Sequence, residues 1–465
     1  MIAEQLAAWV VEAAEIPDDV TATTLAHVLD GLGTAVGARR LDACGPTLTV
    51  ARGLGGPAEA TLLGEATRVG APAAALASGV MVHALDFDDT HAGGLVHPTA
   101  VALPAALAVG EQVGATGREV LDAVTVGLEV ACRIGAAAPH AFHRRGLHAT
   151  MVAGVFASAA VAARLSGLDA TTTTDALGIA GSQAGGLLAF LGTGASTKQL
   201  HPGLASHAGI LAARLAAAGA SGPATVLDGP HGLYDALADT TARPSQVVEG
   251  LGECWEVRSI GFKPWPTCQL AHATMAAAQA GLFAAGVAGS RVRAVHARVH
   301  PDSASVVCAP DRDLAAPASP YAAKFSLPWS VAALVLDGRL GTDTYSETAL
   351  ERADARALAA AVTWEVDAAA VGHAADAPGD VRLRLDDGRT LHGRVERSPG
   401  SDGALPARDL HAKLRGNAGP RADEVAAAVA ALPLAPDLRG LLRAVARAVE
   451  APDEIPTPDR QEADA

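Results

Sequence analysis

The segment from His83 to Thr99, HALDFDDTHAGGLVHPT, concentrates groups that can bind and release protons. It contains three carboxylates, three imidazoles and two threonine hydroxyls, whereas the sequence on both sides is almost entirely alanine, valine, leucine and glycine. Burying so many ionisable groups in an apolar chain costs free energy, and proteins accept that cost chiefly at functional sites. The segment therefore predicts a buried, carboxylate-rich site that transfers protons.

Two other interpretations of this segment are open. Asp88 and Asp89 could simply accept hydrogen bonds from the backbone of a polar loop that follows a helix. An aspartate-rich magnesium site would place carboxylates one helical turn apart, but the residues four positions after Asp88 and Asp89 are Ala92 and Gly93. We therefore expect no metal ion at this segment.

A second block, Gly146-Leu-His148-Ala-Thr150, precedes a long apolar stretch with helical spacing. This order places the His148 imidazole near a helix N-terminus, where the helix dipole favours bound anions and lowers the pKa of a histidine. The alternative is that Thr150 caps the helix and that His148 lies at the surface.

Two further blocks each contribute a lysine. Lys198 and His201 lie in a small-residue segment between two apolar helical patterns, and Lys263 lies where the sequence pattern changes, at an inferred domain junction. Alternatively, Lys198 could be a solvated side chain on a linker, and Lys263 an exposed side chain on a hinge between domains. Cationic groups beside Asp86 and the histidines would hold a di- or tricarboxylate and move a proton next to one of its carboxylates.

The block Tyr321-Ala-Ala-Lys-Phe-Ser326-Leu-Pro-Trp329 begins another apolar helical pattern. A serine and an aromatic ring at the start of a helix could line a pocket. Core packing of Trp329 is the alternative.

Composition excludes several functional classes. The chain has 465 residues, a formal net charge of −15 and only 3% aromatic residues. The charge argues against nucleic acid and anionic membrane surfaces as partners, although a pocket can still bind a small anion. Five scattered cysteines without a C-x-x-C pair are typical of a reducing compartment. With no basic stretch at the N-terminus and no apolar run long enough for a bilayer, we expect a cytoplasmic protein.

The elements that must position these residues change in type along the chain. We expect helices over Thr21–Val36, Pro72–His83, Thr99–Val113, Arg118–Ala131, Ala149–Leu165, Thr173–Ala189 and Gly203–Ala218. In residues 292–299 apolar and polar residues alternate roughly, as in a half-buried strand. Residues 381–395 are predicted to form a hairpin around Asp-Gly, and residues 321–336 to form a helix. The prediction is a mainly α fold: a helical domain over 1–266 and 405–450, a smaller α+β lid over 267–404, and a disordered acidic tail over 451–465.

The order of these blocks resembles the MmgE/PrpD family, which includes 2-methylcitrate dehydratase, cis-aconitate decarboxylase and iminodisuccinate epimerase. The resemblance rests on His-x-x-Asp-Phe-Asp-Asp-Thr-His…His-Pro over 83–98, Gly-x-His-x-Thr over 146–150, Ser-x-Lys-x-x-His over 196–201 and Phe-Lys-x-x-Pro over 262–266. It implies a helical domain plus a lid, an active site between them, a homodimer, and neither metal nor organic cofactor.

The resemblance also assigns residues. The family's decarboxylase site matches this chain at six positions: Asp86, Thr90, His97, His148, Lys198 and Lys263. The family tyrosine of the Phe-Ser-x-x-Tyr block is Trp329 here, which points to a specialised substrate. We expect Asp86, His97 and His148 to be catalytic, and the substrate to be bound by Thr90, Lys198, His201, Lys263 and Trp329.

The resulting hypothesis is a cofactor-independent lyase that moves a proton next to a carboxylate of a small anionic substrate. Dehydration is the first expectation, and decarboxylation or epimerisation by the same equipment is the alternative. A non-catalytic binding or scaffold protein is an alternative of another class.

Overall fold

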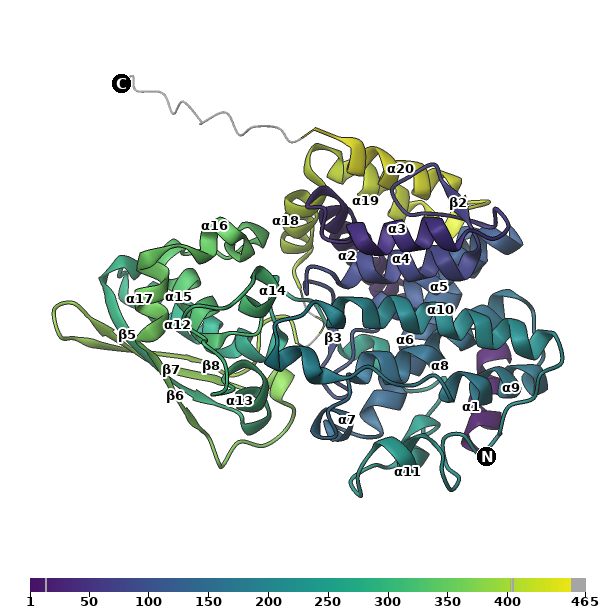
Figure 1. The fold of residues 1–465 in the computed structure, drawn as a ribbon, viewed down its shortest axis with the longest axis horizontal. Helices are drawn as coiled ribbons and strands as arrows, with labels where there is room; N and C mark the ends of the chain where they lie inside the picture. Colours follow the sequence, from purple (N-terminus) through teal and green to yellow (C-terminus); the bar gives the residue numbers. More distant parts are fainter. Residues whose placement is uncertain (13–14, 402, 404, 453–465) are drawn as a thin grey trace.

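The computed structural model describes residues 1–12, 15–401, 403 and 405–452, which form a helical domain and a smaller lid (Figure 1). Each part has its own hydrophobic core. One core joins buried residues within 2–262 to residues within 410–448, and the other lies within 270–385 and also takes in Ala92 and Leu95. The predicted mainly α fold with an α+β lid is confirmed. The predicted tail, 451–465, lies outside the described residues from 453 onward.

The helices of the larger domain come from both ends of the described chain. The N-terminal set is α1 (Ile2–Glu12), α2 (Asp18–Arg40), α3 (Gly45–Leu54), α4 (Ala71–His83), α5 (Thr99–Val113), α6 (Gly117–Ala136), α7 (Ala141–Arg144), α8 (Ala149–Leu165), α9 (Ala170–Gly181), α10 (Thr197–Ala217) and α11 (Leu233–Leu237). The C-terminal set, which packs on α2, is α18 (Ala407–Ala418), α19 (Ala422–Ala430) and α20 (Arg439–Glu450).

Two predicted helix boundaries are wrong by more than five residues. Helix α9 ends at Gly181, before the predicted end at Ala189, because the Gly185-Gly186 pair follows and Gly186 adopts a positive φ of 92°. Helix α10 begins at Thr197 and not at Gly203. Pro202 lies inside α10, where it forgoes one backbone hydrogen bond without ending the helix. Lys198 and His201 therefore lie in the first two turns of α10 and not on a loop.

Glycines set the close crossing of α4 and α10, the two helices that carry site residues at their ends. A Cβ added to Gly79 would lie 2.7 Å from the Cα of Gly203, and a Cβ added to Gly203 would lie 2.3 Å from the Leu76 carbonyl oxygen. Only glycine tolerates such an approach between backbones. Every residue of α4 is buried, and this crossing places the start of α10 beside the chain that leaves α4.

The lid is built on a four-stranded sheet in the order β6 (Val362–Val366), β5 (Val292–Val299), β7 (Gly379–Leu385) and β8 (Thr390–Val395), in which β5 is parallel to β6 and antiparallel to β7. Its predicted hairpin is present, with Gly388 at a φ of 84° in the turn between β7 and β8. Helix α12 packs on β7 and β8 (Figure 1). The lid elements are α12 (His272–Ala285), β5 (Val292–Val299), α13 (Pro301–Val307), α14 (Pro320–Ala323), α15 (Leu327–Asp337), α16 (Glu347–Leu350), α17 (Ala353–Ala360), β6 (Val362–Val366), β7 (Gly379–Leu385) and β8 (Thr390–Val395).

The helix predicted over 321–336 is broken into α14 and α15. The Ser326 hydroxyl accepts a hydrogen bond from the Trp329 backbone N–H, so Ser326 caps α15, and Pro328 lies in the first turn of that helix. The short segment 324–326 between the two helices changes the directions in which Phe325 and Trp329 point.

Two short strand pairs complete the fold. Strands β1 (Ala60–Thr61) and β2 (Arg68–Val69) pair within the helical domain. Strand β3 (Thr90–His91) pairs with β4 (Ile260–Gly261), which joins the chain just after Asp86 to the chain just before Lys263. Among the described helices, none combines the length and hydropathy needed to cross a membrane.

Candidate active site

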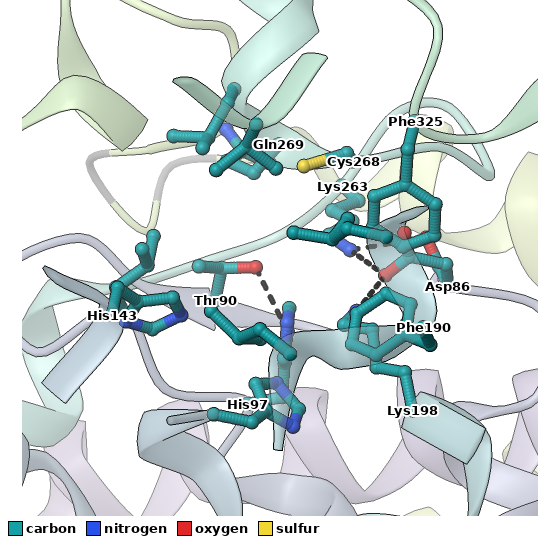
Figure 2. Close-up of a pocket in the computed structure, with 16 residues that line it drawn as sticks. Asp86, Thr90, His97, His143, Phe190, Lys198, Lys263, Cys268, Gln269 and Phe325 are labelled. Atoms are coloured by element: carbon teal, nitrogen blue, oxygen red, sulfur yellow. Dashed lines mark hydrogen bonds and ion pairs between the residues drawn. The ribbon is translucent and has the colours of Figure 1, made fainter. Parts of the chain in front are cut away.

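Asp86 lies where α4 has ended and the chain turns toward β3. Its φ of 51° is unusual for a residue other than glycine. The ammonium groups of Lys198 and Lys263 each lie 2.8 Å from Asp86 Oδ1, and Lys263 also donates to the Asp86 carbonyl oxygen at 3.0 Å (Figure 2). Burial alone would raise the pKa of the Asp86 carboxyl, but the two ammonium groups outweigh it and hold that pKa well below its ordinary value.

The two lysines retain donors for a ligand. An ammonium group has three N–H bonds. Lys198 donates one of them to Asp86, and Lys263 donates two, to the carboxylate and to the carbonyl of that residue. Both side chains line the same pocket, so two donors of Lys198 and one of Lys263 remain for an anion.

Three buried imidazoles form a cluster beside this ion triad. The ring centroids of His83 and His97 lie 4.7 Å apart, and His148 lies 5.7 Å from the first and 5.8 Å from the second. Burial, reinforced by the nearby ammonium groups, lowers the pKa of all three rings well below the ordinary value of 6.5. All three are therefore neutral at pH 7 in the ligand-free protein.

Hydrogen bonds assign the tautomer of His97. Its Nδ1 lies 2.7 Å from the Asp89 carbonyl oxygen, which can only accept, so Nδ1 carries the proton and Nε2 holds the lone pair. The Thr90 hydroxyl lies 3.2 Å from the same Nδ1 (Figure 2). The His97 backbone N–H donates to the Thr150 hydroxyl, so Thr150 supports His97 and does not cap α8.

His148 occupies the N-cap of α8, as its position before the apolar stretch predicted. Its Nδ1 lies 3.1 Å from Nδ1 of His201, so one ring donates to the other. Its buried Nε2 has no hydrogen-bond partner within the described chain, although the side chain lines the pocket. His201 lies behind His148 and does not itself line the pocket.

The three aspartates of the DFDD segment have three different partners. Asp86 binds the lysines, and Asp88 Oδ2 lies 2.7 Å from Nδ1 of His83. Asp89 accepts hydrogen bonds from the backbone N–H and the hydroxyl of Thr99, so it holds the start of α5. His83 is part of the predicted segment, but its residue type and position alone do not indicate this contact with Asp88.

Three lysines from distant parts of the chain anchor three consecutive carbonyl groups around Asp86. Lys324 donates to the Leu85 carbonyl at 2.8 Å, Lys263 to the Asp86 carbonyl at 3.0 Å, and Lys413 to the Phe87 carbonyl at 2.6 Å. We call this arrangement the lysine clamp. Lys324 belongs to the lid and Lys413 to α18, so the clamp ties both to the Asp86 turn.

The pocket lies between the domains, where about 470 Å³ of space is free of protein atoms, open solvent at the mouth included. Besides the residues described above, its wall includes His143 and Gln269, and an apolar cluster covers one side (Figure 2). This cluster, which we call the apolar wall, joins the 3₁₀ helix η1 (Leu188–Gly192) to the lid. Its aliphatic and aromatic members that line the pocket are Leu188, Phe190, Leu191, Val306 and Phe325, and Cys268 lines the pocket beside them.

The structure brings together six of the eight predicted site residues in the pocket wall: Asp86, Thr90, His97, His148, Lys198 and Lys263. His201 contacts His148 and does not itself line the pocket. Trp329 is placed elsewhere: it is 1% exposed, belongs to the lid core and is absent from the pocket wall, where Phe325 stands instead. Trp329 therefore packs in the lid core, which was the alternative expected for this residue, and does not line the pocket.

Two groups of side chains have the donor types and spacing that a metal ion would need. Ligand atoms of His83, His97 and His148 lie within 4.8 Å of one another, and so do those of His83, Asp86 and Asp88. The first group fits a Zn²⁺-type ion by its nitrogen donors. Asp86 in the second group is already paired with two ammonium groups, and the positive charge that its single carboxylate leaves uncompensated opposes a cation at either place.

Comparison with known proteins agrees with this fold. Residues 4–245 match the MmgE/PrpD N-terminal domain and residues 265–432 match the MmgE/PrpD C-terminal domain. The chain belongs to the MmgE/PrpD family. It is 28% identical over 439 residues to a cis-aconitate decarboxylase of Aspergillus terreus, a match that covers 88% of this chain and 87% of the relative.

Mammalian relatives carry the same name. The chain is 29% identical to the cis-aconitate decarboxylases of Homo sapiens and Mus musculus, over 74% of its own length in both cases and 72% and 71% of theirs. The resemblance inferred from the sequence blocks and the expectation of an enzyme of the lyase class are both confirmed.

Proposed function

We propose that the protein is a cofactor-independent carboxy-lyase that acts on a small unsaturated carboxylate. The observation that carries this proposal is the Asp86 carboxylate held by two ammonium groups that keep free donors, directly beside neutral imidazoles. The ammonium groups bind and charge-stabilise a substrate carboxylate, and an imidazole moves the proton. We further propose that the enzyme works as a homodimer.

The proposed reaction breaks one carbon–carbon bond. The bond to the departing carboxylate is cleaved, carbon dioxide leaves, and the electron pair passes into the unsaturated system conjugated with a retained carboxylate. Lys198 and Lys263 stabilise that charge, and Thr90 holds an oxygen of the substrate. His97 or His148, protonated when the anion binds, then delivers its proton to carbon and regains one from solvent.

The apolar wall favours decarboxylation over the dehydration expected first. A carboxylate that becomes neutral carbon dioxide is helped by apolar surroundings, whereas a departing hydroxide needs polar groups to receive it. The wall is built of five aliphatic and aromatic side chains. The names of the relatives point in the same direction.

The test is incubation of the purified protein with cis-aconitate in D₂O, followed by NMR and carbon dioxide detection. Decarboxylation yields carbon dioxide and a product with one carbon-bound deuterium. Hydration without carbon dioxide would replace the proposal with a dehydratase, and absence of both products and of deuterium exchange across a panel of unsaturated carboxylates would favour a scaffold. His392→Gln, an exposed histidine on the far strand β8, is the matched control for histidine variants of the pocket.

A further inference from the structure

Two histidines of the short helix α7 have no role in the reaction described above. His140 is the N-cap of α7 and has a φ of 56°, which is unusual for a residue other than glycine. His143 follows three positions later and lines the pocket (Figure 2). The two ring centroids lie 6.3 Å apart, as expected for side chains of one helical turn. Helix α7 therefore brings one imidazole to the pocket and holds a second, only 6% exposed, outside the pocket wall.

A tight turn after α7 brings this pair of rings beside the imidazole cluster of the site. The Gly146 backbone N–H donates to the His143 carbonyl at 2.9 Å, and Gly146 has a φ of 76°, so the chain reverses before α8 begins. The ring centroid of His148 consequently lies 6.2 Å from that of His143 and 5.8 Å from that of His97. We call these four rings the histidine row, which comprises, in spatial order, His140, His143, His148 and His97.

The outer end of the histidine row reaches the lid. His140 Nδ1 lies 3.4 Å from Oδ2 of Asp302, which is in the first turn of α13. The Asp302 side chain is 35% exposed, so its carboxylate can exchange protons with solvent. The row thus leads from a solvent-exposed carboxylate of the lid to the imidazoles of the site.

Three nitrogen atoms of the histidine row have unused hydrogen-bonding capacity. His140 Nε2, His143 Nδ1 and His148 Nε2 are buried and have no hydrogen-bond partner within the described chain. A buried imidazole nitrogen without a partner costs free energy, and ordered water commonly satisfies such groups. A water molecule with two hydrogen bonds joins nitrogens about 5 Å apart, which is compatible with ring centroids 6.2 and 6.3 Å apart.

The outer rings of the row are neutral at pH 7. Burial lowers the pKa of His140 to about 4, although Asp302 opposes this effect, and lowers the pKa of His143 to about 3. A neutral imidazole has one N–H donor and one acceptor nitrogen, so it can take up a proton on one side and release another on the other side. A charged ring in this row is therefore short-lived, as transfer along a relay requires.

We propose that His140 and His143 form a proton relay that carries protons from Asp302 through bridging water molecules to His148. The inference rests on the proposed function, in which an imidazole gives its proton to carbon and must regain one. At each ring or water molecule one proton arrives and another leaves, so no charge remains in the row, and Asp302 replaces the proton from solvent. Rotation of the neutral rings restores their starting tautomers. His140 and His143 act through His148 and do not themselves protonate the substrate.

The outer end of the relay is tested by steady-state kinetics with cis-aconitate. His140→Gln and Asp302→Asn remove groups outside the pocket wall, so we expect kcat to fall about tenfold or more in each while KM stays unchanged. The ratio of kcat in H₂O to kcat in D₂O should rise, because return of the proton becomes the slow step. His392→Gln and Asp380→Asn, which break an exposed histidine–aspartate pair of the lid, are the matched controls and should keep the parent values. Parent-like kcat in His140→Gln and Asp302→Asn would overturn the relay.

The inner end of the relay is tested by chemical rescue. His143→Ala opens space in the pocket wall that free imidazole can enter. We expect turnover of this variant to fall and to be partly restored by added imidazole, whereas His140→Gln, altered outside the wall, should not be rescued. A loss of turnover with a raised KM and no rescue would show that His143 supports the pocket and carries no proton.

The bridging water molecules give a readout that needs no turnover. A high-resolution crystal structure of the parent protein should show ordered water between the rings of His140 and His143 and between those of His143 and His148. Gaps without ordered water would overturn the relay, whatever the activity of the variants.

Failure of this inference is separable from failure of the proposed function. Carbon dioxide release that the relay variants leave unchanged would refute the relay and leave the carboxy-lyase intact. Proton uptake on maleate binding can be followed by stopped flow with a pH indicator. Slower uptake in His140→Gln than in the parent, with bridging water present but no carbon dioxide released from any carboxylate tested, would refute the carboxy-lyase and leave the relay intact.

Discussion

The Lys413 ammonium, near the C-terminal end of the described chain, lies 2.6 Å from the carbonyl oxygen of Phe87, the residue that follows Asp86. The same ammonium lies 2.7 Å from Asp30 of α2 and 4.1 Å from the centre of the Phe87 ring. Both charged side chains are almost fully buried. Helix α18 thus reaches the turn that carries Asp86 through a hydrogen bond from one buried lysine, which also forms an ion pair with α2.

Replacing Lys413 should therefore damage both stability and activity. Lys413→Met leaves Asp30 buried without its partner, and we expect a loss of about 3–5 kcal/mol in the free energy of unfolding, measured by urea denaturation. Adding Asp30→Asn should recover part of that loss, because the unpaired charge is removed. Turnover should fall in both variants, since the Phe87 carbonyl loses its anchor. Arg415→Met, on the exposed side of α18, is the control, and equal effects of Lys413→Met and Arg415→Met would contradict the clamp.

Lys324 should make stability depend on pH. Burial lowers the pKa of Lys324 from 10.5 to about 7, with Asp86 only partly opposing that effect. Between pH 7 and 10.5 the unfolded chain keeps this proton and the folded chain has lost it, so the free energy of unfolding gains a contribution that rises with pH over this window and is absent below it. We expect the free energy of unfolding of the parent, relative to that of Lys324→Met, to be larger at pH 9 than at pH 6.5 when both are measured by urea denaturation. A constant difference between the two proteins would contradict the lowered pKa.

The acid–base role of the imidazoles has a direct test. General acid–base catalysis is worth about 10²–10⁴ in rate, so His97→Gln and His148→Gln should each lower turnover by about that factor. Circular dichroism and gel filtration should show both variants folded. His392→Gln should keep full turnover. Parent-like rates in both pocket variants would mean that these rings are structural.

Sequence predicted the side chains of the site better than the contacts that hold them. Asp86, Lys198 and Lys263 could be grouped because each lies in a distinctive block beside an apolar helical pattern. Lys324 and Lys413 were missed because they contact the Asp86 turn through backbone carbonyls, which leave no mark on residue type and lie 239 and 326 residues away in the chain. Such contacts exist only once the lid and α18 have packed.

Trp329 illustrates the opposite error, in which a motif position suggested a role that the local backbone does not support. A single continuous helix over 321–336 would have been compatible with an aromatic ring at 329 in the pocket. The Ser326 cap begins a new helix, so that Phe325 lines the pocket and Trp329 packs in the lid core. Periodicity showed that the segment is helical but not where it breaks.

Substrate binding should be coupled to proton uptake. The pKa values of His97 and His148 lie well below 6.5 in the ligand-free protein, because burial and the nearby ammonium groups oppose a further positive charge. A carboxylate bound at Lys198 and Lys263 supplies negative charge and raises these pKa values. Calorimetry of maleate binding in two buffers with different ionisation enthalpies should show uptake of protons that increases from pH 8 to pH 6. Binding without proton exchange throughout that range would contradict the proposed proton donor.

We expect the protein to turn over its substrate without a metal ion. His83, His97 and His148 have the donors for a zinc-type ion, so residue types alone do not exclude a metal. The charges argue against it: burial is the main reason that the pKa values of these rings are lowered, but the Lys198 ammonium lowers all three further and the Lys263 ammonium lowers those of His83 and His97, by the same repulsion that a divalent cation would meet. We therefore expect turnover to survive exhaustive dialysis against EDTA, with no stoichiometric metal found by elemental analysis. Loss of turnover that Zn²⁺, Mn²⁺ or Mg²⁺ restores would show that the three histidines bind a metal ion in spite of this repulsion. In that case His83→Gln, which removes a ligand outside the pocket wall, would abolish both metal binding and turnover.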